Sequence, residues 1–298
     1  MNRFLHLILS TLFILCAFGL AACTGPKATI HVGSKDFTEQ FVVAEMYAHV
    51  LEDAGFEIVR DLNIGATPLV HEKMLAGEIS IYPEYTGTSF LTVLKQDVKT
   101  DPVTVYNEVA TMYAEQFNLT VLEPAPMNNT QAIAMTKERA AELGISSISD
   151  LVANASDIVL VGPIEFIDRE DGLAGLKGLY GEFEFAEYRP IDPGLRYIAL
   201  ANGEIDAVVA FGTDGQISEF DLLVLEDDQQ FWPPYQIAPV IQSELIETYP
   251  EIETRLNKLA PLLTDDTMRR LNNEVSTNGR SPADVAREFL LESELISQ

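Results

Sequence analysis

Cysteine and basic residues are both scarce in this 298-residue sequence. The two cysteines, Cys16 and Cys23, lie close to the start, so the rest of the chain has no pair for a disulfide and must rely on packing. Lysine and arginine together number 19 against 46 aspartates and glutamates, which gives a formal net charge of −27. A surface of that sign repels nucleic acid and anionic lipid headgroups. We therefore expect no nucleic-acid partner.

Residues that carry metal binding or catalysis are few as well. Beyond the first 22 residues the histidines are His31, His49 and His71, and their spacing matches no zinc-ligand pattern. The sequence has no G-x-S-x-G nucleophile elbow, no P-loop and no dinucleotide fingerprint. We therefore expect no enzymatic activity, no metal and no cofactor, and these absences disfavour the alternative of a secreted bilobed enzyme.

Residues 1–22 are predicted to be a lipoprotein signal peptide. Arg3 precedes an apolar run of signal-peptide length, which is short for a membrane span of about 20 apolar residues. The run ends in "LAAC", which resembles the lipobox of bacterial lipoproteins, where the cysteine is diacylated and becomes the N-terminus. An ordinary signal peptide or a short anchor helix are the alternatives. We expect Cys23 to carry a lipid anchor, and no later stretch is apolar enough to span a membrane.

Strand-like and helix-like runs alternate along the rest of the chain, which predicts layers of α/β structure. Asp36 and Glu39 have the spacing of a capping box, so a helix should begin near Phe37, with both acidic residues as caps and Gly55 ending it. From residue 243 onward the pattern is mostly helical.

The sequence repeats its own plan. "VGSKDFTEQ" aligns with "VGPIEFIDR" at a shift of 129 residues, and "AGEISIYPEYTG" aligns with "NGEIDAVVAFGTDG" at a shift of 126, which pairs Tyr85 with Phe211. Two matches in the same order at nearly the same offset predict two related α/β lobes. Each lobe would have a polar turn after one strand and an aromatic residue at the end of another. Because ligands bind beyond the carboxyl ends of such strands, two facing lobes should enclose a cleft.

Several longer motifs resemble those of one protein family. They are "GSKDFTEQ", "GEISIYPEYTGT", "NNTQAIAM", "GISSISDL", "LRYIALANGEIDAVVAFGTDGQI" and "VLEDDQQFWPPYQIAPV". Together, over about residues 29–290, they resemble the substrate-binding proteins of osmoprotectant ABC importers, which take up glycine betaine, choline, carnitine and proline betaine. The resemblance implies a bilobed periplasmic-binding-protein fold, type II-like, with two α/β lobes around a central cleft that closes on the ligand.

The same resemblance divides the chain. Residues 23–130 would form the N-terminal part of the first lobe, residues 131–232 the second lobe, and residues 233–298 the return to the first lobe with its C-terminal helices. The chain would cross between the lobes near residues 128–131 and 232–235, where "NNT" and "WPPY" offer turn and hinge chemistry.

An aromatic cage is implied for the quaternary ammonium group of such a ligand. That group has no N–H to donate, but aromatic faces attract it by about 0.5 to 2 kcal/mol each. The residues that match the family's cage are Tyr85 and Tyr235, both expected in polar turns, and Phe211, at the end of an apolar strand. Ordinary packing is the alternative for each of them.

Polar contacts are implied at further positions. Arg169 matches the carboxylate-binding arginine of the family, and a guanidinium can hold both carboxylate oxygens. A surface arginine among acidic neighbours is the alternative. Lys35, Gln40 and Thr88 match other polar ligand contacts of the family, and Asn129 is expected to contact the ligand as well.

One position departs from the family pattern. Gln131 stands where the family commonly has a tyrosine, and an amide cannot supply the same cation–π attraction, although it can hydrogen-bond a polar substituent. The sequence therefore leaves open which osmoprotectant binds and how tightly.

The expected protein is an extracytoplasmic, lipid-anchored monomer. It would capture a small quaternary-ammonium or zwitterionic solute and deliver it to an ABC permease and its ATPase. A receptor that presents its solute to a sensor would have the same fold, and the sequence does not decide between the two, nor which membrane holds the anchor.

Overall fold

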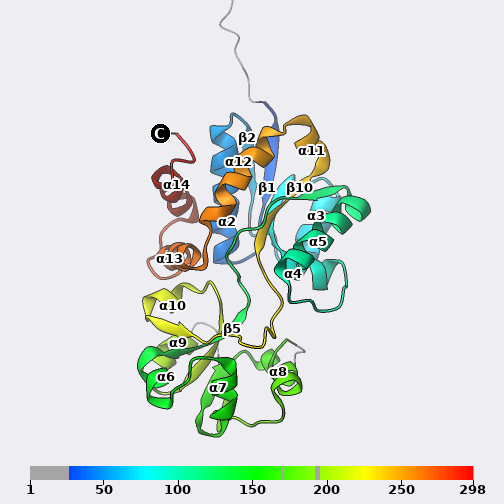
Figure 1. Ribbon diagram of the computed structural model, residues 1–298. Helices are drawn as coiled ribbons and strands as arrows, with labels where there is room; N and C mark the ends of the chain where they lie inside the picture. The colour runs from blue at the N-terminus through cyan, green and yellow to red at the C-terminus, as the bar shows by residue number, and fades with distance from the viewer. Residues whose placement is uncertain (1–26, 169–170, 192–194, 298) are drawn as a thin grey trace, which may run out of the picture.

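The computed structural model describes residues 27–168, 171–191 and 195–297, which form two lobes joined by two segments of chain (Figure 1). Both ends of the described chain lie in the larger lobe. Cys23 and Arg169 fall outside the described residues. In the part of the chain that is described, no helix has the length and apolar character needed to cross a membrane.

A mixed five-stranded sheet in the order β2-β1-β3-β10-β4 forms the centre of the larger lobe. The strands β1, β2 and β3 run parallel, whereas β10 is antiparallel to both of its neighbours. Their bounds are β1 (Thr29–Gly33), β2 (Glu57–Asp61), β3 (Ile81–Tyr85), β4 (Leu119–Val121) and β10 (Ile237–Gln242).

Helices cover both faces of this sheet. One apolar cluster buries α2 and the C-terminal helices, and another buries α3 and α5 on the opposite side (Figure 1). The helices are α2 (Thr38–Asp53), α3 (Thr67–Leu75), α4 (Thr86–Thr88) with the π-turn η1 (Ser89–Val93), α5 (Pro102–Phe117), α11 (Ser243–Thr248), α12 (Glu251–Leu259) with the 3₁₀ turn η4 (Ala260–Leu262), α13 (Asp265–Ser276) and α14 (Pro282–Glu292). The expected helical character of the chain after residue 243 is therefore confirmed.

The smaller lobe repeats this plan around a sheet of order β7-β6-β8-β5-β9. Its strands are β5 (Gln131–Thr136), β6 (Val159–Gly162), β7 (Glu187–Pro190), β8 (Ala207–Phe211) and β9 (Leu222–Val224). Its helices are α6 (Lys137–Leu143), α7 (Ile148–Ala153), α8 (Leu173–Tyr180), α9 (Arg196–Ala201) and α10 (Gly215–Glu219), with the 3₁₀ turns η2 (Ala155–Asp157) and η3 (Ile164–Ile167).

The internal repeat is confirmed strand by strand. β6, β7 and β8 pair in parallel as β1, β2 and β3 do, and in each sheet the next strand is antiparallel and follows a crossing between the lobes. Gly33 and Gly162 end the equivalent strands β1 and β6, and Tyr85 and Phe211 end β3 and β8. The two aromatic residues therefore occupy the same position in their lobes.

The two crossing segments are hydrogen-bonded to each other. The amide N–H of Asn129 donates to the carbonyl oxygen of Tyr235 at 3.1 Å, and the N–H of Tyr235 donates to Oδ1 of Asn128 at 2.7 Å. The hydroxyl of Thr130 adds a bond of 3.3 Å to the carbonyl of Pro233. The crossings thus form a short paired connection between the lobes.

The capping box predicted at the start of α2 is wrong. The helix begins at Thr38 as expected, but its N-cap is Phe37, which makes no side-chain cap bond. Glu39 instead turns into the protein, where 3% of its surface is exposed. The side chains of Tyr85, Asn129 and Asn272 donate hydrogen bonds to its carboxylate there, so it does not return to the backbone. Gly55, with φ +91°, follows the C-cap Ala54 and ends the helix as predicted.

Candidate functional site

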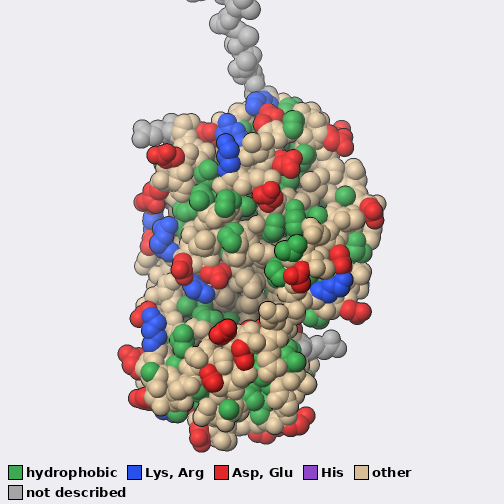
Figure 2. Space-filling model, in the orientation of Figure 1, with side chains coloured by type: hydrophobic (Ala, Val, Ile, Leu, Met, Phe, Trp, Pro, Cys, Tyr) green, Lys and Arg blue, Asp and Glu red, His purple; other side chains and the backbone are tan. Residues whose placement is uncertain are grey.

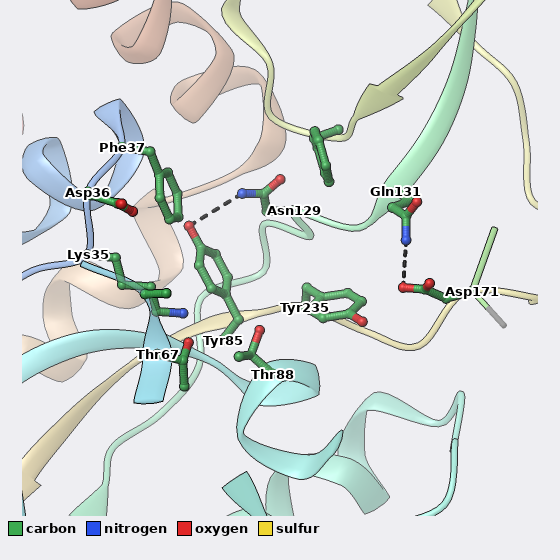
Figure 3. A pocket seen from close by; sticks show the side chains of 12 residues that line it. Lys35, Asp36, Phe37, Thr67, Tyr85, Thr88, Asn129, Gln131, Asp171 and Tyr235 are labelled. Carbon is green, nitrogen blue, oxygen red and sulfur yellow. Dashed lines mark hydrogen bonds between the residues drawn. The ribbon is translucent and has the colours of Figure 1, made fainter. Parts of the chain in front are cut away.

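A cavity of about 290 Å³ lies between the lobes, next to the paired crossings (Figure 3). The turn after β1, the last residues of β3 and β8, and residues of both crossings contribute to its lining, so the site lies at the carboxyl ends of strands in both sheets. The lining residues are Lys35, Asp36, Phe37, Ala66, Thr67, Tyr85, Thr88, Asn129, Gln131, Asp171, Phe211 and Tyr235.

Most of the residues singled out in the sequence meet at this cavity. Lys35, Tyr85, Thr88, Asn129, Gln131, Phe211 and Tyr235 all line it. Gln40 does not: it is fully buried, and its Oε1 accepts the backbone N–H of Lys35 at 3.2 Å. That bond shapes the turn that presents Lys35. The contribution of these side chains to ligand binding stays a prediction.

Aromatic rings reach the cavity from both lobes. Tyr85 ends β3 and stacks with Phe37, their centroids 6.3 Å apart and their planes at 14°. Phe211 ends β8 and keeps 37% of its surface exposed, and Tyr235 approaches from the second crossing. An exposed aromatic residue at a strand end, facing other rings across a cavity, offers its π-face to a ligand.

Tyr85 does not sit in the polar turn expected for it. It is the last residue of a fully buried strand and is itself buried. Its hydroxyl donates a hydrogen bond of 2.7 Å to Oε1 of Glu39, and Nδ2 of Asn129 donates to the same oxygen at 2.9 Å. The ring is therefore fixed from its far end before any ligand is present.

Burial controls the protonation of this pair. Desolvation raises the pKa of Glu39 above its ordinary value, although hydrogen bonds with Thr213, Tyr85, Asn272 and Asn129 act in the opposite direction. Burial, followed by the nearby Glu39 charge, raises the pKa of Tyr85 well above its usual range. The phenol thus stays neutral and continues to donate to the carboxylate.

Lys35 lines the cavity and also forms an ion pair inside the first lobe. Its ammonium forms a buried ion pair with Glu84 and lies 4.9 Å from the centroid of the Tyr85 ring. The other oxygen of Glu84 accepts the hydroxyl of Thr67 at 3.2 Å. Because the charge of Lys35 is already paired with that of Glu84, this lysine is not free to pair with a ligand carboxylate.

The opposite wall is polar. Gln131 begins β5, is 7% exposed, and donates from Nε2 to Oδ2 of Asp171 at 2.6 Å (Figure 3). The indole N–H of Trp232 holds the backbone carbonyl of Asp171 at 2.9 Å. Gln131 is also the register partner of Phe211 across β5 and β8, so the amide and the ring are neighbours in this wall.

The sequence interpretation missed several lining residues. The sequence predicts Phe37 only as the start of a helix, yet 38% of its surface is exposed and it stacks on Tyr85. An aromatic residue amid the polar residues of the first turn was a usable signal. Asp171 lies two positions beyond Arg169 in the segment already singled out. The sequence predicts Asp36 as a cap residue, and it gives no signal that Ala66 or Thr67 lines a cavity.

The described residues hold no group of three or more His, Cys, Asp or Glu side chains arranged to bind a metal ion. What the cavity offers is aromatic surface, hydroxyl and amide groups, and carboxylates from Asp36 and Asp171. Such a set can surround a small organic cation and hydrogen-bond a polar group attached to it.

Two related α/β lobes, joined by two crossings and sharing a cavity between them, define a bilobed solute-binding protein of the periplasmic-binding-protein type. The chain belongs to the family described as the substrate binding domain of ABC-type glycine betaine transport systems, whose model matches residues 28–292.

The comparisons with individual proteins agree. The chain is 34% identical to a glycine-betaine-binding protein of Pseudomonas aeruginosa, over 99% of this chain and 96% of that one. It is 35% identical to an ergothioneine transport permease/ergothioneine binding protein of Helicobacter pylori, over 87% of this chain and 46% of that longer protein. A crystal structure titled glycine betaine/carnitine/choline ABC transporter superimposes with a TM-score of 0.86 at 30% identity, covering 90% of this chain and all of the other. These relatives are named for binding and transport, not for catalysis.

Proposed function

We propose that this protein captures a small quaternary-ammonium solute of the betaine or choline type outside the cytoplasm and delivers it to an ABC permease and its ATPase. Family membership supports the transport role. The observation that carries the choice of ligand is the meeting of Phe37, Tyr85, Phe211 and Tyr235 at one cavity between the lobes.

The chemistry of the ligand explains this lining. A trimethylammonium group is bulky and cationic and has no N–H, so it gains most from aromatic faces that replace water around it. The hydroxyl of Thr88 can donate to a carboxylate or hydroxyl at the other end of the solute, and Arg169 is proposed to join it. The acidic side chains spread over both lobes add a long-range attraction for cations (Figure 2).

The lipid anchor is part of the same proposal. Cys23 in "LAAC" is proposed to be diacylated, which would hold the protein at the membrane surface beside its permease while the lobes remain in water. The support for it is the position of this cysteine at the end of the apolar leader.

Identification of the natural ligand tests the function. Protein purified gently from its own cells is denatured, and the released solute is identified by mass spectrometry. Purified protein is then titrated calorimetrically with glycine betaine, choline, carnitine, proline betaine and ergothioneine, the last because of the Helicobacter pylori relative. The proposal expects a quaternary-ammonium compound in both experiments. Release of an unrelated solute, with no heat from any compound of the panel, would overturn it.

A further inference from the structure

Helix α13 of the larger lobe holds the loop that follows the aromatic residue Phe211 of the smaller lobe. Nε of Arg269 donates to the carbonyl oxygen of Gly212 at 2.7 Å, and Nδ2 of Asn272 donates to the carbonyl oxygen of Thr213 at 2.9 Å. Two side chains spaced one helical turn apart thus bind successive carbonyls directly after the ring that lines the cavity. In Figure 1, α13 lies beside α10, which begins where this loop ends.

The same amide of Asn272 also bonds Glu39, the carboxylate that accepts the hydroxyl of Tyr85 on the other side of the cavity. Its Nδ2 donates to Oε2 of Glu39 at 2.8 Å, and Oε1 of Glu39 accepts the hydroxyl of Tyr85 at 2.7 Å. Asn272 is 6% exposed. One buried side chain therefore contacts both the carboxylate that anchors Tyr85 and the loop that carries Phe211.

The backbone of this loop lies very close to two neighbouring segments. A Cβ atom on Gly212 would lie 2.3 Å from the carbonyl oxygen of Asn128 in the first crossing, and one on Gly215 would lie 2.6 Å from the backbone nitrogen of Asn273 in α13. The N–H of Gly212 donates to the carbonyl of Thr130 at 2.9 Å. The loop is thus held between the first crossing and α13.

We propose that Arg269 and Asn272 are positioning residues for the binding site. They fix the 212–213 carbonyls and so hold the ring of Phe211 at a set distance from Tyr85 before a ligand arrives. A ligand that meets two pre-placed rings does not have to order them, which strengthens binding. The identity of the ligand rests on the proposed function, whereas the fixing of Phe211 does not depend on it.

The first test measures affinity for choline and glycine betaine by calorimetry. Asn272→Ala and Arg269→Ala should each weaken binding about three- to tenfold, the loss that accompanies freeing one ordered side chain. Arg269→Lys keeps one donor and should recover part of the affinity. The matched control is Arg270→Ala, which removes the same charge from the next residue, whose side chain is exposed. It should bind like the parent.

A double-mutant cycle separates positioning from general support of the fold. Arg269 bonds the loop but not Glu39, so if it acts through Phe211, then Arg269→Ala should cost little further affinity once Phe211→Leu has removed the ring. An undiminished loss in the Phe211→Leu background would overturn the proposal, as would parental affinity in both Asn272→Ala and Arg269→Ala. Arg269→Ala gives an independent reading if Asn272→Ala folds poorly.

The second test needs no ligand. Hydrogen exchange of the ligand-free protein, read on peptides spanning residues 207–217, should be faster in Asn272→Ala and Arg269→Ala and unchanged in Arg270→Ala. If the parent binds no quaternary-ammonium compound, the proposed function fails, while this measurement still decides whether α13 fixes the loop. Unchanged exchange in both variants would overturn the positioning role.

Discussion

The ammonium group of Lys35 lies 4.9 Å from the centre of the Tyr85 ring, so one face of this cavity ring already meets a cation of the protein itself. Glu84 pairs with the same ammonium, and both side chains of that ion pair are almost completely buried. The lysine thus helps to stabilise the first lobe. Its replacement should lower the free energy of unfolding, whatever its effect on ligand binding.

Breaking this ion pair on one side should be costly. Lys35→Met leaves the buried carboxylate of Glu84 unpaired, and the free energy of unfolding should fall by about 3 kcal/mol or more. The double variant Lys35→Met with Glu84→Gln removes both charges and should recover most of that loss. Urea unfolding of the parent, both single variants and the double variant measures the cycle; equal losses in the single variant Lys35→Met and the double variant would contradict the pairing.

The buried carboxyl of Glu39 predicts a pH dependence of stability. Its pKa is higher in the folded than in the unfolded protein because of burial, so the folded state binds the proton more tightly. The contribution of Glu39 to stability is therefore greatest at acidic pH and decreases as pH rises from its ordinary pKa of 4.5 through the raised value in the folded protein.

Glu39→Gln does not titrate and serves as the reference. The difference in unfolding free energy, parent minus variant, should become smaller as pH rises above about 4.5, measured by urea unfolding at a series of pH values. A difference that grows with pH would mean that the folded state favours the carboxylate over the acid.

The ring of Tyr85 and its hydroxyl should have separate effects. Tyr85→Leu removes the π-face and should weaken binding of trimethylammonium ligands by about 1 to 2 kcal/mol, or roughly five- to thirtyfold. Tyr85→Phe keeps the ring and should lose much less affinity. Its cost should appear in stability instead, by about 1 kcal/mol, since Glu39 loses a donor. Calorimetric titration and urea unfolding of both variants give the comparison, and equal losses of affinity would contradict a role for the π-face.

Gln131 offers a gain of function. It lines the cavity next to Phe211, so Gln131→Tyr should add an aromatic face and tighten trimethylammonium binding by about 1 to 2 kcal/mol, or roughly five- to thirtyfold. Ligands without a quaternary nitrogen should gain little. Titration with glycine betaine, choline, carnitine and proline betaine measures this, and a natural ligand that needs the space beside Gln131 should bind more weakly while glycine betaine binds more tightly. Unchanged affinity for every ligand would remove Gln131 from the site.

Lipidation is tested at a single atom, the sulfur of Cys23. Cys23→Ser should prevent both acylation and cleavage, because the hydroxyl is not a substrate for the thioether chemistry of the anchor. Fatty-acid labelling in cells measures the acylation, and the mass of the protein product shows whether the leader has been cleaved. A variant that is processed and sediments with membranes like the parent would contradict the assignment.

The sequence predicted those parts of the site that depend on strand order. Tyr85 and Phe211 could be paired because the two lobes repeat one plan, and equivalent strands end at equivalent residues. The start of α2 was also predicted to within one residue, although the capping box used to place it does not form.

The parts that failed depend on residues far apart in the chain. Glu39 has the spacing of a capping residue, but its donors Asn129 and Asn272 lie 90 and 233 residues away, and local spacing cannot reveal them. Asp171 is held in the cavity wall by a hydrogen bond from Gln131, which lies 40 residues earlier in the chain. Burial of polar side chains in this protein is decided by tertiary contacts, and so are the supports of its aromatic rings.

The central claim is that aromatic rings hold a quaternary ammonium group between the lobes, and a pair of ligands tests it most directly. Choline and 3,3-dimethylbutan-1-ol have nearly the same shape, but only choline carries the positive charge. Titration of the parent protein with both should show choline binding more tightly by at least about 1 kcal/mol for the cation–π attraction, which is roughly fivefold. Equal affinity for the two would mean that the cavity recognises shape and apolar surface alone, and would contradict the account.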